Sequence, residues 1–363
     1  MTTVQPRALT DPPVGVDSAW ETVGEHLDRC GRARPPPTRR SSPGLLGLVA
    51  VVGTVVAGVL AAAAAGPGTQ RTVVEVAAMA LRALTYTGVL VAVGGAVFIA
   101  VVHDGHPRER LRLRRLVVAA AGIGVAAGFL AVPVQSAVVT GTGVAGLIDA
   151  STITTVLLSS FGASTLLRAT GLACLLVALP RVWTPSGAVL AAAGATLALV
   201  AFVVTGHAAT GEARWLVAGV TLVHTATAGI WLGGLVQLTV VLRNRATSAD
   251  AVGGARVVGR FSVLAGASLA ALVPTGTILA ARQIDSVGAL VSSGYGRALL
   301  AKIVLVCAVV AVAAYNRWRL MPRLTRNTPD SWRRLHATVR TEVAGLLLVV
   351  VATGLLGRLA PPA

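Results

Sequence analysis

Two histidines stand beside or within apolar segments, and imidazole is a common protein ligand for copper, zinc and iron. His207 directly follows the apolar run 187–206, and His224 lies about ten residues into the apolar run 214–242. A neutral imidazole also costs less to bury than a carboxylate. We therefore take His207 and His224 as the first metal-ligand candidates. The alternatives are an interfacial histidine facing water for His207 and a hydrogen-bonded core histidine for His224.

A second histidine pair, His103 and His106, flanks Asp104 at the end of the apolar run 74–102. Ligand-type side chains at i, i+1 and i+3 suit a metal ion, but five arginines follow between positions 108 and 115 and repel a cation. His103 and His106 are therefore weak candidates. Lys302, the only lysine of the chain, is another weak one, because snorkelling to the membrane interface explains it without a function.

Other polar side chains interrupt the apolar runs. Each calls for a structural or functional explanation, because a charged group at the centre of a bilayer costs about 2.5–3.5 kcal/mol. Trp231 stands seven positions after His224, so the two share one face of a helix. We expect packing around the histidine from this tryptophan. The remaining polar side chains within or at the ends of the runs are Arg82, Gln135, Arg168 and Glu342.

The elements that must position these side chains are transmembrane helices. Of the 363 residues 55% are hydrophobic and 12% are charged, about half the charged share of a soluble domain, which excludes both an ordinary soluble enzyme and a disordered chain. We predict an all-α, polytopic transmembrane helical bundle, in which each helix needs about 17–25 apolar residues. The nine predicted spans are 44–65, 74–102, 114–137, 164–182, 187–206, 214–242, 258–281, 296–316 and 341–358.

The predicted domain organisation has three parts. Residues 1–43 are polar and are expected to be a disordered cytosolic tail. Residues 44–73 are expected to supply an additional N-terminal transmembrane helix and its loop, and residues 74–363 the main membrane domain. The connection 138–163 contains Gly-Thr-Gly-Val-Ala-Gly, but the strand that a dinucleotide-binding loop requires is missing, so we interpret it as an external loop, in part re-entrant.

The arginines predict the orientation of the bundle. The tail and alternate loops on one side carry 23 arginines, and the other side carries five. By the positive-inside rule the N-terminus is cytosolic and, with nine spans, the C-terminus lies outside. The net charge of +17 is thus mainly a topology signal, with anionic lipid headgroups and not nucleic acid as the partner. Motifs of hydrolases, zinc proteases and nucleotide-binding loops are absent from the sequence, so we expect no enzyme.

Motifs in the second half of the chain and around 75–102 resemble the copper-resistance D (CopD) family of bacterial inner-membrane proteins. The residues that carry the resemblance are Gly206-His207-Ala208, Val223-His224, Ile230-Trp231-Leu232-Gly233-Gly234-Leu235, Arg260-Phe261-Ser262, Thr275-Gly276, Tyr295-Gly296-Arg297 through Lys302, Asn316-Arg317, Pro322-Arg323 and, earlier, Arg82, Tyr86 and Gly94-Gly95. The resemblance covers about the last 290 residues. The family pattern has eight helices. The resemblance therefore implies that 44–65 and the tail are an N-terminal addition to this pattern.

The resemblance implies a role in moving copper across the cytoplasmic membrane, often together with a small periplasmic copper-binding protein. His207 and His224 would then be successive copper stations, at the external mouth and near the centre. Arg82, Gln135 and Trp231 would line the path or pack around it. Copper, and not haem, is the expected ligand. Two alternatives stay open, a haem-binding electron-transfer bundle and a non-transporting copper-sensing or oxidase-assembly component.

Overall fold

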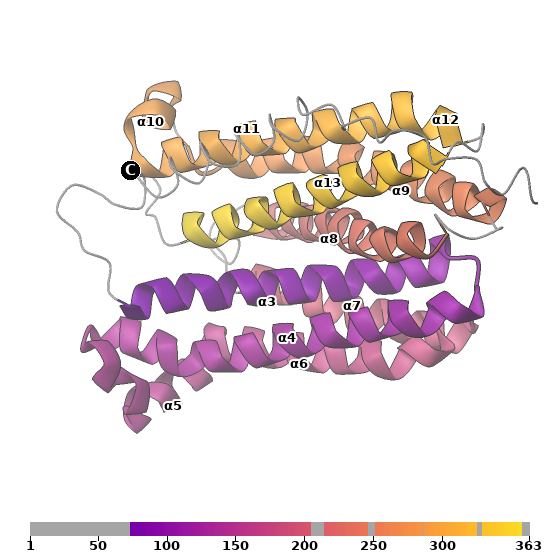
Figure 1. Cartoon of the computed structure of the whole chain (residues 1–363). Coiled ribbons are helices and arrows are strands. Elements are labelled where there is room, and N and C mark those ends of the chain that lie inside the picture. Colours follow the sequence, from indigo (N-terminus) through magenta and orange to yellow (C-terminus); the bar gives the residue numbers. More distant parts are fainter. Residues whose placement is uncertain (1–72, 205–213, 246–250, 285, 325–328, 358–363) are drawn as a thin grey trace, which may run out of the picture. The chain divides into compact units, whose positions relative to one another are not determined.

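A computed structural model describes residues 73–204, 214–245, 251–284, 286–324 and 329–357 (Figure 1). Within these ranges the chain is helical, and eight helices are long and apolar enough to cross a membrane. This confirms the predicted all-α bundle for the described part of the chain. The tail 1–43, the predicted span 44–65 and His207 lie outside the described residues.

The spanning helices follow the apolar runs of the sequence, with charged extensions at some ends. They are α3 (Val73–Val97) with its π-helical end η1 (Phe98–Val102), α4 (Pro107–Thr140), α6 (Ser160–Ala178), α7 (Pro185–Val204), α8 (Arg214–Arg245), α9 (Ala251–Ala281), α11 (Gly294–Tyr315) with η5 (Asn316–Leu320) and α12 (Met321–Leu324), and α13 (Pro329–Leu356). Both α9 and α13 begin earlier than predicted, because arginines are good helix formers and extend a helix beyond its apolar part.

Helix α3 lies at the centre of the packing and contacts α4, α8 and α13. Its crossing with α8 depends on glycine. A Cβ atom added to Gly94 would lie 1.8 Å from the carbonyl oxygen of Gly229, and one added to Gly233 would lie 2.7 Å from the nitrogen of Gly95. Small residues let transmembrane backbones approach this closely. Gly94 and Gly95 of α3 thus pack directly against Gly229 and Gly233 of α8.

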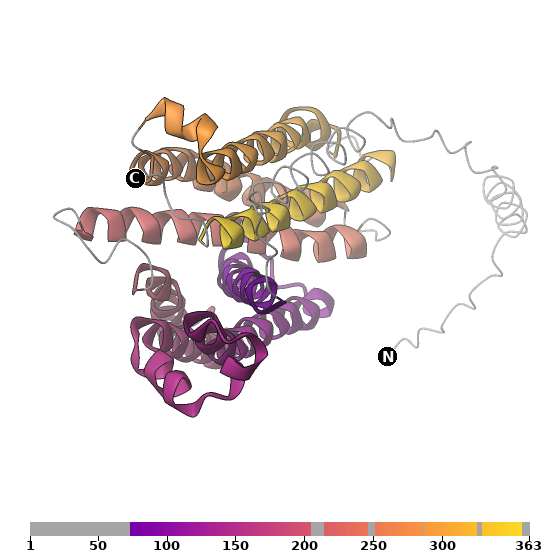
Figure 2. The ribbon, with the colours of Figure 1, turned by 90° about the vertical axis from the view of Figure 1, so that its left-hand side faces the viewer.

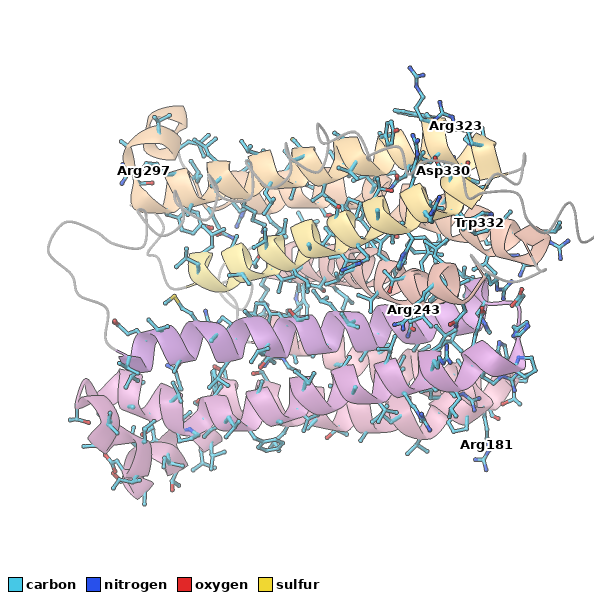
Figure 3. The ribbon with its side chains drawn as sticks, in the orientation of Figure 1. Arg181, Arg243, Arg297, Arg323, Asp330 and Trp332 are labelled. Atoms are coloured by element: carbon cyan, nitrogen blue, oxygen red, sulfur yellow. The ribbon has the colours of Figure 1, made fainter. Side chains whose placement is uncertain are left out.

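The ends of the bundle differ in charge. Arg181, Arg243 and Arg323 lie at one end, which we call the arginine-rich end, and Arg297 lies at the opposite end (Figure 3). Helices α4, α9 and α13 begin at the arginine-rich end, and α8 ends there. The described arginines thus separate along the helix axes as their positions in the sequence predict.

The connection between α4 and α6 lies at the opposite end and consists of two short helices, η2 (Gly143–Ile148) and α5 (Ala150–Leu158). Gly141 ends α4 with a φ of 66° and donates its N–H to the oxygen of Ala137, a conformation that favours glycine. The first glycine of the Gly-Thr-Gly-Val-Ala-Gly motif therefore ends helix α4. The short helices α5 and α10 (Val287–Ser292) lie on different sides of this end (Figures 1 and 2).

Candidate functional site

His224 lies on α8 and is directed at α9. Its Nδ1 atom is 3.1 Å from the hydroxyl oxygen of Thr275. The next residue, Gly276, leaves room for the ring, since a Cβ atom there would lie 3.2 Å from Cε1 of the imidazole. The Thr275-Gly276 pair of the sequence therefore forms the wall that holds the imidazole. His224 itself is half-buried, so the ring is held on one side without being sealed in.

The hydrogen bonds of Thr275 determine which imidazole nitrogen carries the hydrogen. Its Oγ1 lies 2.6 Å from the carbonyl oxygen of Ala271, one turn earlier in α9. A carbonyl only accepts, so the single hydroxyl hydrogen points at Ala271 and Thr275 accepts the Nδ1–H of His224. The Nε2 atom is then left with its lone pair, which is the state of a metal-ligating histidine oriented by a second partner.

Lys302 belongs to the same region of the bundle. It lies on α11, is half-buried, and is close enough to interact electrostatically with His224. The sequence suggested only that Lys302 reaches the membrane interface. The structure adds that this amine interacts electrostatically with the imidazole, and a protonated amine there disfavours any further positive charge. The charge of Lys302 therefore affects how strongly His224 can bind a cation.

The other sequence-predicted residues occupy separate places. Arg82 donates from Nη1 to the carbonyl oxygen of Gly357 at 2.8 Å and so caps the C-terminal end of α13. Trp231 is 4% exposed and packs in the apolar core, two turns along α8 from His224. Gln135 is half-buried on α4, near the opposite end of the bundle. His207 is not among the described residues, so the two-station arrangement stays a prediction.

The second histidine group forms an ion-pair network with Arg245, the last residue of α8. Ligand atoms of His103, Asp104 and Glu109 all lie within 4.8 Å of one another. Arg245 donates to both oxygens of Asp104 at 2.8 and 2.7 Å and to both oxygens of Glu109 at 2.9 Å. His103 uses Nε2 toward Glu109 at 3.2 Å, and its Nδ1 accepts the N–H of Gly105.

This network fits a structural role better than a metal site. The guanidinium already supplies the cation that two carboxylates require, and both nitrogens of His103 are engaged. The hydrogen bond from Arg245 lowers the pKa of Asp104 to about 2, so this carboxylate stays charged. The backbone N–H of His106 donates to Oδ1 of Asp104 at 3.4 Å, but its side chain remains outside the network, with Nδ1 buried and without a hydrogen-bond partner among the described residues. Spacing could not reveal Arg245, which is 136 positions from Glu109.

Comparisons with known proteins relate most of the described chain to copper proteins. A family model described as "Copper resistance protein D-like, N-terminal domain" matches residues 73–215, and one described as "Copper resistance protein D" matches residues 255–356. Thr275 and Lys302 lie in the second match, whereas His224 lies between the two. The combined matches run from the first described helix to the last.

One relative of known name is similar over part of the chain. The "Copper transport protein CutJ" of Bacillus subtilis (strain 168) is 30% identical over 157 residues, which are 43% of this chain. The match spans only 28% of that relative's length. No solved structure matches the chain.

Proposed function

Because this membrane protein belongs to the copper resistance protein D family, we propose that it moves copper ions across the cytoplasmic membrane. Two family models in sequence order support the assignment to the family, and the relative named as a copper transport protein supports the cargo. The proposal is a transport role and not an enzymatic one. Copper is the cargo here and not a resident cofactor.

The observation that carries this proposal is the hydrogen bond between Nδ1 of His224 and the hydroxyl of Thr275, which leaves the lone pair of the imidazole on Nε2. Thr275 fixes the tautomer and the ring orientation through Nδ1, the nitrogen that would not bind the ion. Partners of metal-ligating histidines act in the same way. The site lies among α8, α9 and α11, so small movements between these helices would change access to it. A half-buried neutral imidazole inside a helical bundle suits an ion that must bind and then leave.

The orientation that we propose places the arginine-rich end in the cytosol, following the positive-inside rule. His224 is ten residues after the first residue of α8, at about 15 Å along the helix, and so would lie in the external half. His207 would then form a first station at the external mouth, with Arg82 and Gln135 near that end of the bundle. A small external copper-binding protein would deliver or collect the ion there.

Anionic phospholipids are the membrane partner that we propose at the cytosolic end. Helices α4 and α8 border a cleft of about 520 Å³ that is lined by Arg112, Arg115 and Arg243. Leu116 and Val240 form part of its apolar lining. Basic clefts of this kind between helices accept lipid headgroups, with the acyl chains on the apolar part.

Copper flux into proteoliposomes tests the proposed function. Vesicles with the purified protein should accumulate copper down a gradient, and empty vesicles should not. A non-transporting sensor or assembly component would bind copper without flux. An optical spectrum of the same preparation separates the haem alternative, because a haem bundle gives a Soret band and a copper site does not.

A further inference from the structure

A second buried ionisable group lies away from His224, in the half of the bundle toward the arginine-rich end. Glu342 of α13 is 3% exposed, at the start of the apolar part of that helix. The side-chain amide of Asn316, itself 7% exposed, donates from Nδ2 to Oε1 of Glu342. Among the residues that the structure describes, no arginine, lysine or histidine forms an ion pair with Glu342.

The other end of the same amide is unsatisfied. The Oδ1 atom of Asn316 is buried and finds no hydrogen-bond donor among the described residues. A carboxylate only accepts hydrogen bonds, so it cannot satisfy Oδ1, whereas a carboxylic acid has one O–H to donate. The amide and the neutral acid therefore complement each other. Exchanging the amide's oxygen and nitrogen would place Oδ1 against Oε1, which also requires a proton between the two oxygens.

The backbone of Asn316 is itself unusual. This residue begins η5, a π-helical turn inserted between α11 and α12. π-Helical turns interrupt the regular hydrogen-bond ladder of a helix and are frequent at functional sites. Here the turn coincides with the residue whose side chain meets Glu342 on the neighbouring helix.

A small cavity beside the pair provides room for water. It measures about 60 Å³, enough for a water molecule, and lies between α8, α9, α13 and the end of α11. Arg317 of η5 is the one other lining residue with an ionisable side chain, and its Nη1 donates to the backbone and hydroxyl oxygens of Ser262. The lining from α8 and α13 is apolar apart from Glu342, with Leu238 and Val339 as examples.

We propose that Glu342 and Asn316 form a proton-binding site, occupied at neutral pH, that exchanges its proton with water in the adjoining cavity. On release the O–H bond at Oε2 breaks, the proton passes to a water molecule as hydronium, and the electron pair stays on the carboxylate. Arg317, which lines the same cavity, is the cation available to compensate that charge. The assigned role is proton exchange that accompanies copper movement, and this role rests on the proposed function.

Infrared spectroscopy of the purified full-length protein tests the site without copper. A carbonyl-stretching band of a protonated carboxylic acid should be present at neutral pH and disappear at alkaline pH. Glu342→Gln should remove the band, and Asn316→Leu should shift it. Glu75→Gln, which changes an exposed carboxyl group on α3, should leave it unchanged. No protonated-acid band at neutral pH, or a band that survives Glu342→Gln, would overturn the proposal.

Proteoliposomes with a trapped pH-sensitive dye test the role. Wild type and Glu75→Gln should move protons together with copper, and Glu342→Gln should move copper with at least a tenfold smaller proton signal. Unchanged proton movement in Glu342→Gln would refute the coupling. An absence of copper flux in every variant would instead contradict the proposed function, while the infrared band would still decide whether Glu342 binds a proton.

Discussion

Thr275 of α9 accepts the Nδ1–H of His224 of α8, across a contact between residues 51 positions apart. The hydroxyl hydrogen of Thr275 is committed to Ala271, so this direction of donation is fixed. The consequence is an imidazole that is oriented by α9 and keeps its lone pair on Nε2. This relationship gives the ring the orientation that a metal ligand would need.

Removing the hydroxyl of Thr275 should weaken copper binding without unfolding the bundle. We expect Thr275→Val to lower copper affinity about 10–100-fold, the effect typical of losing an outer partner of a metal ligand, and Thr275→Ser to retain most of it. Competition with a copper chelator measures this. Thr277→Val is the matched control, because Thr277 is exposed on the same helix and its hydroxyl donates only to the backbone of that helix. Equal losses in both valine variants would contradict the assignment.

Arg245 should matter for stability and not for copper. Arg245→Ala leaves two carboxylates without their cation, and breaking a buried ion pair in this way costs about 3–5 kcal/mol. Thermal unfolding in detergent should show a clearly lower midpoint than for Arg256→Ala, which removes an exposed arginine. If His103→Ala lowered the copper stoichiometry, the network would be a metal site after all.

Asp104 should make stability depend on pH in the acidic range. Its pKa is lowered from 3.8 to about 2 in the folded protein, so the folded state binds this proton less readily than the unfolded state. The resulting stabilisation is complete above pH 3.8 and is lost as the pH falls toward about 2. We expect Asp104→Asn to flatten this part of an unfolding-midpoint profile. An unchanged slope would show that the ion pair does not form in solution.

The cleft between α4 and α8 should bind anionic phospholipid. Replacing Arg112 and Arg243 together with glutamine should reduce the anionic lipid that stays bound in native mass spectrometry at least several-fold, because two of the three lining cations are lost. Arg297→Gln, at the opposite end, should have little effect. Equal retention of zwitterionic and anionic lipid by the wild type would contradict a headgroup site.

The spans could be predicted because an apolar run is a property of the local sequence. The bilayer fixes the length of an apolar run, and small residues identify surfaces where helices approach. Hydropathy also singled out His224 and Glu342 as groups that need a reason. The partners Thr275, Arg245 and Asn316 could not be assigned, because the spacing within one helix defines a face but not the face that packs against it.

Copper flux in proteoliposomes containing His224→Ala tests the central claim most directly. The matched control is His336→Ala, which removes a half-buried histidine of α13 near the arginine-rich end. Both variants must insert and elute as wild type does in size-exclusion chromatography. We predict flux at the level of empty vesicles for His224→Ala and nearly wild-type flux for His336→Ala. Wild-type flux in His224→Ala would contradict the role of His224 as a copper station.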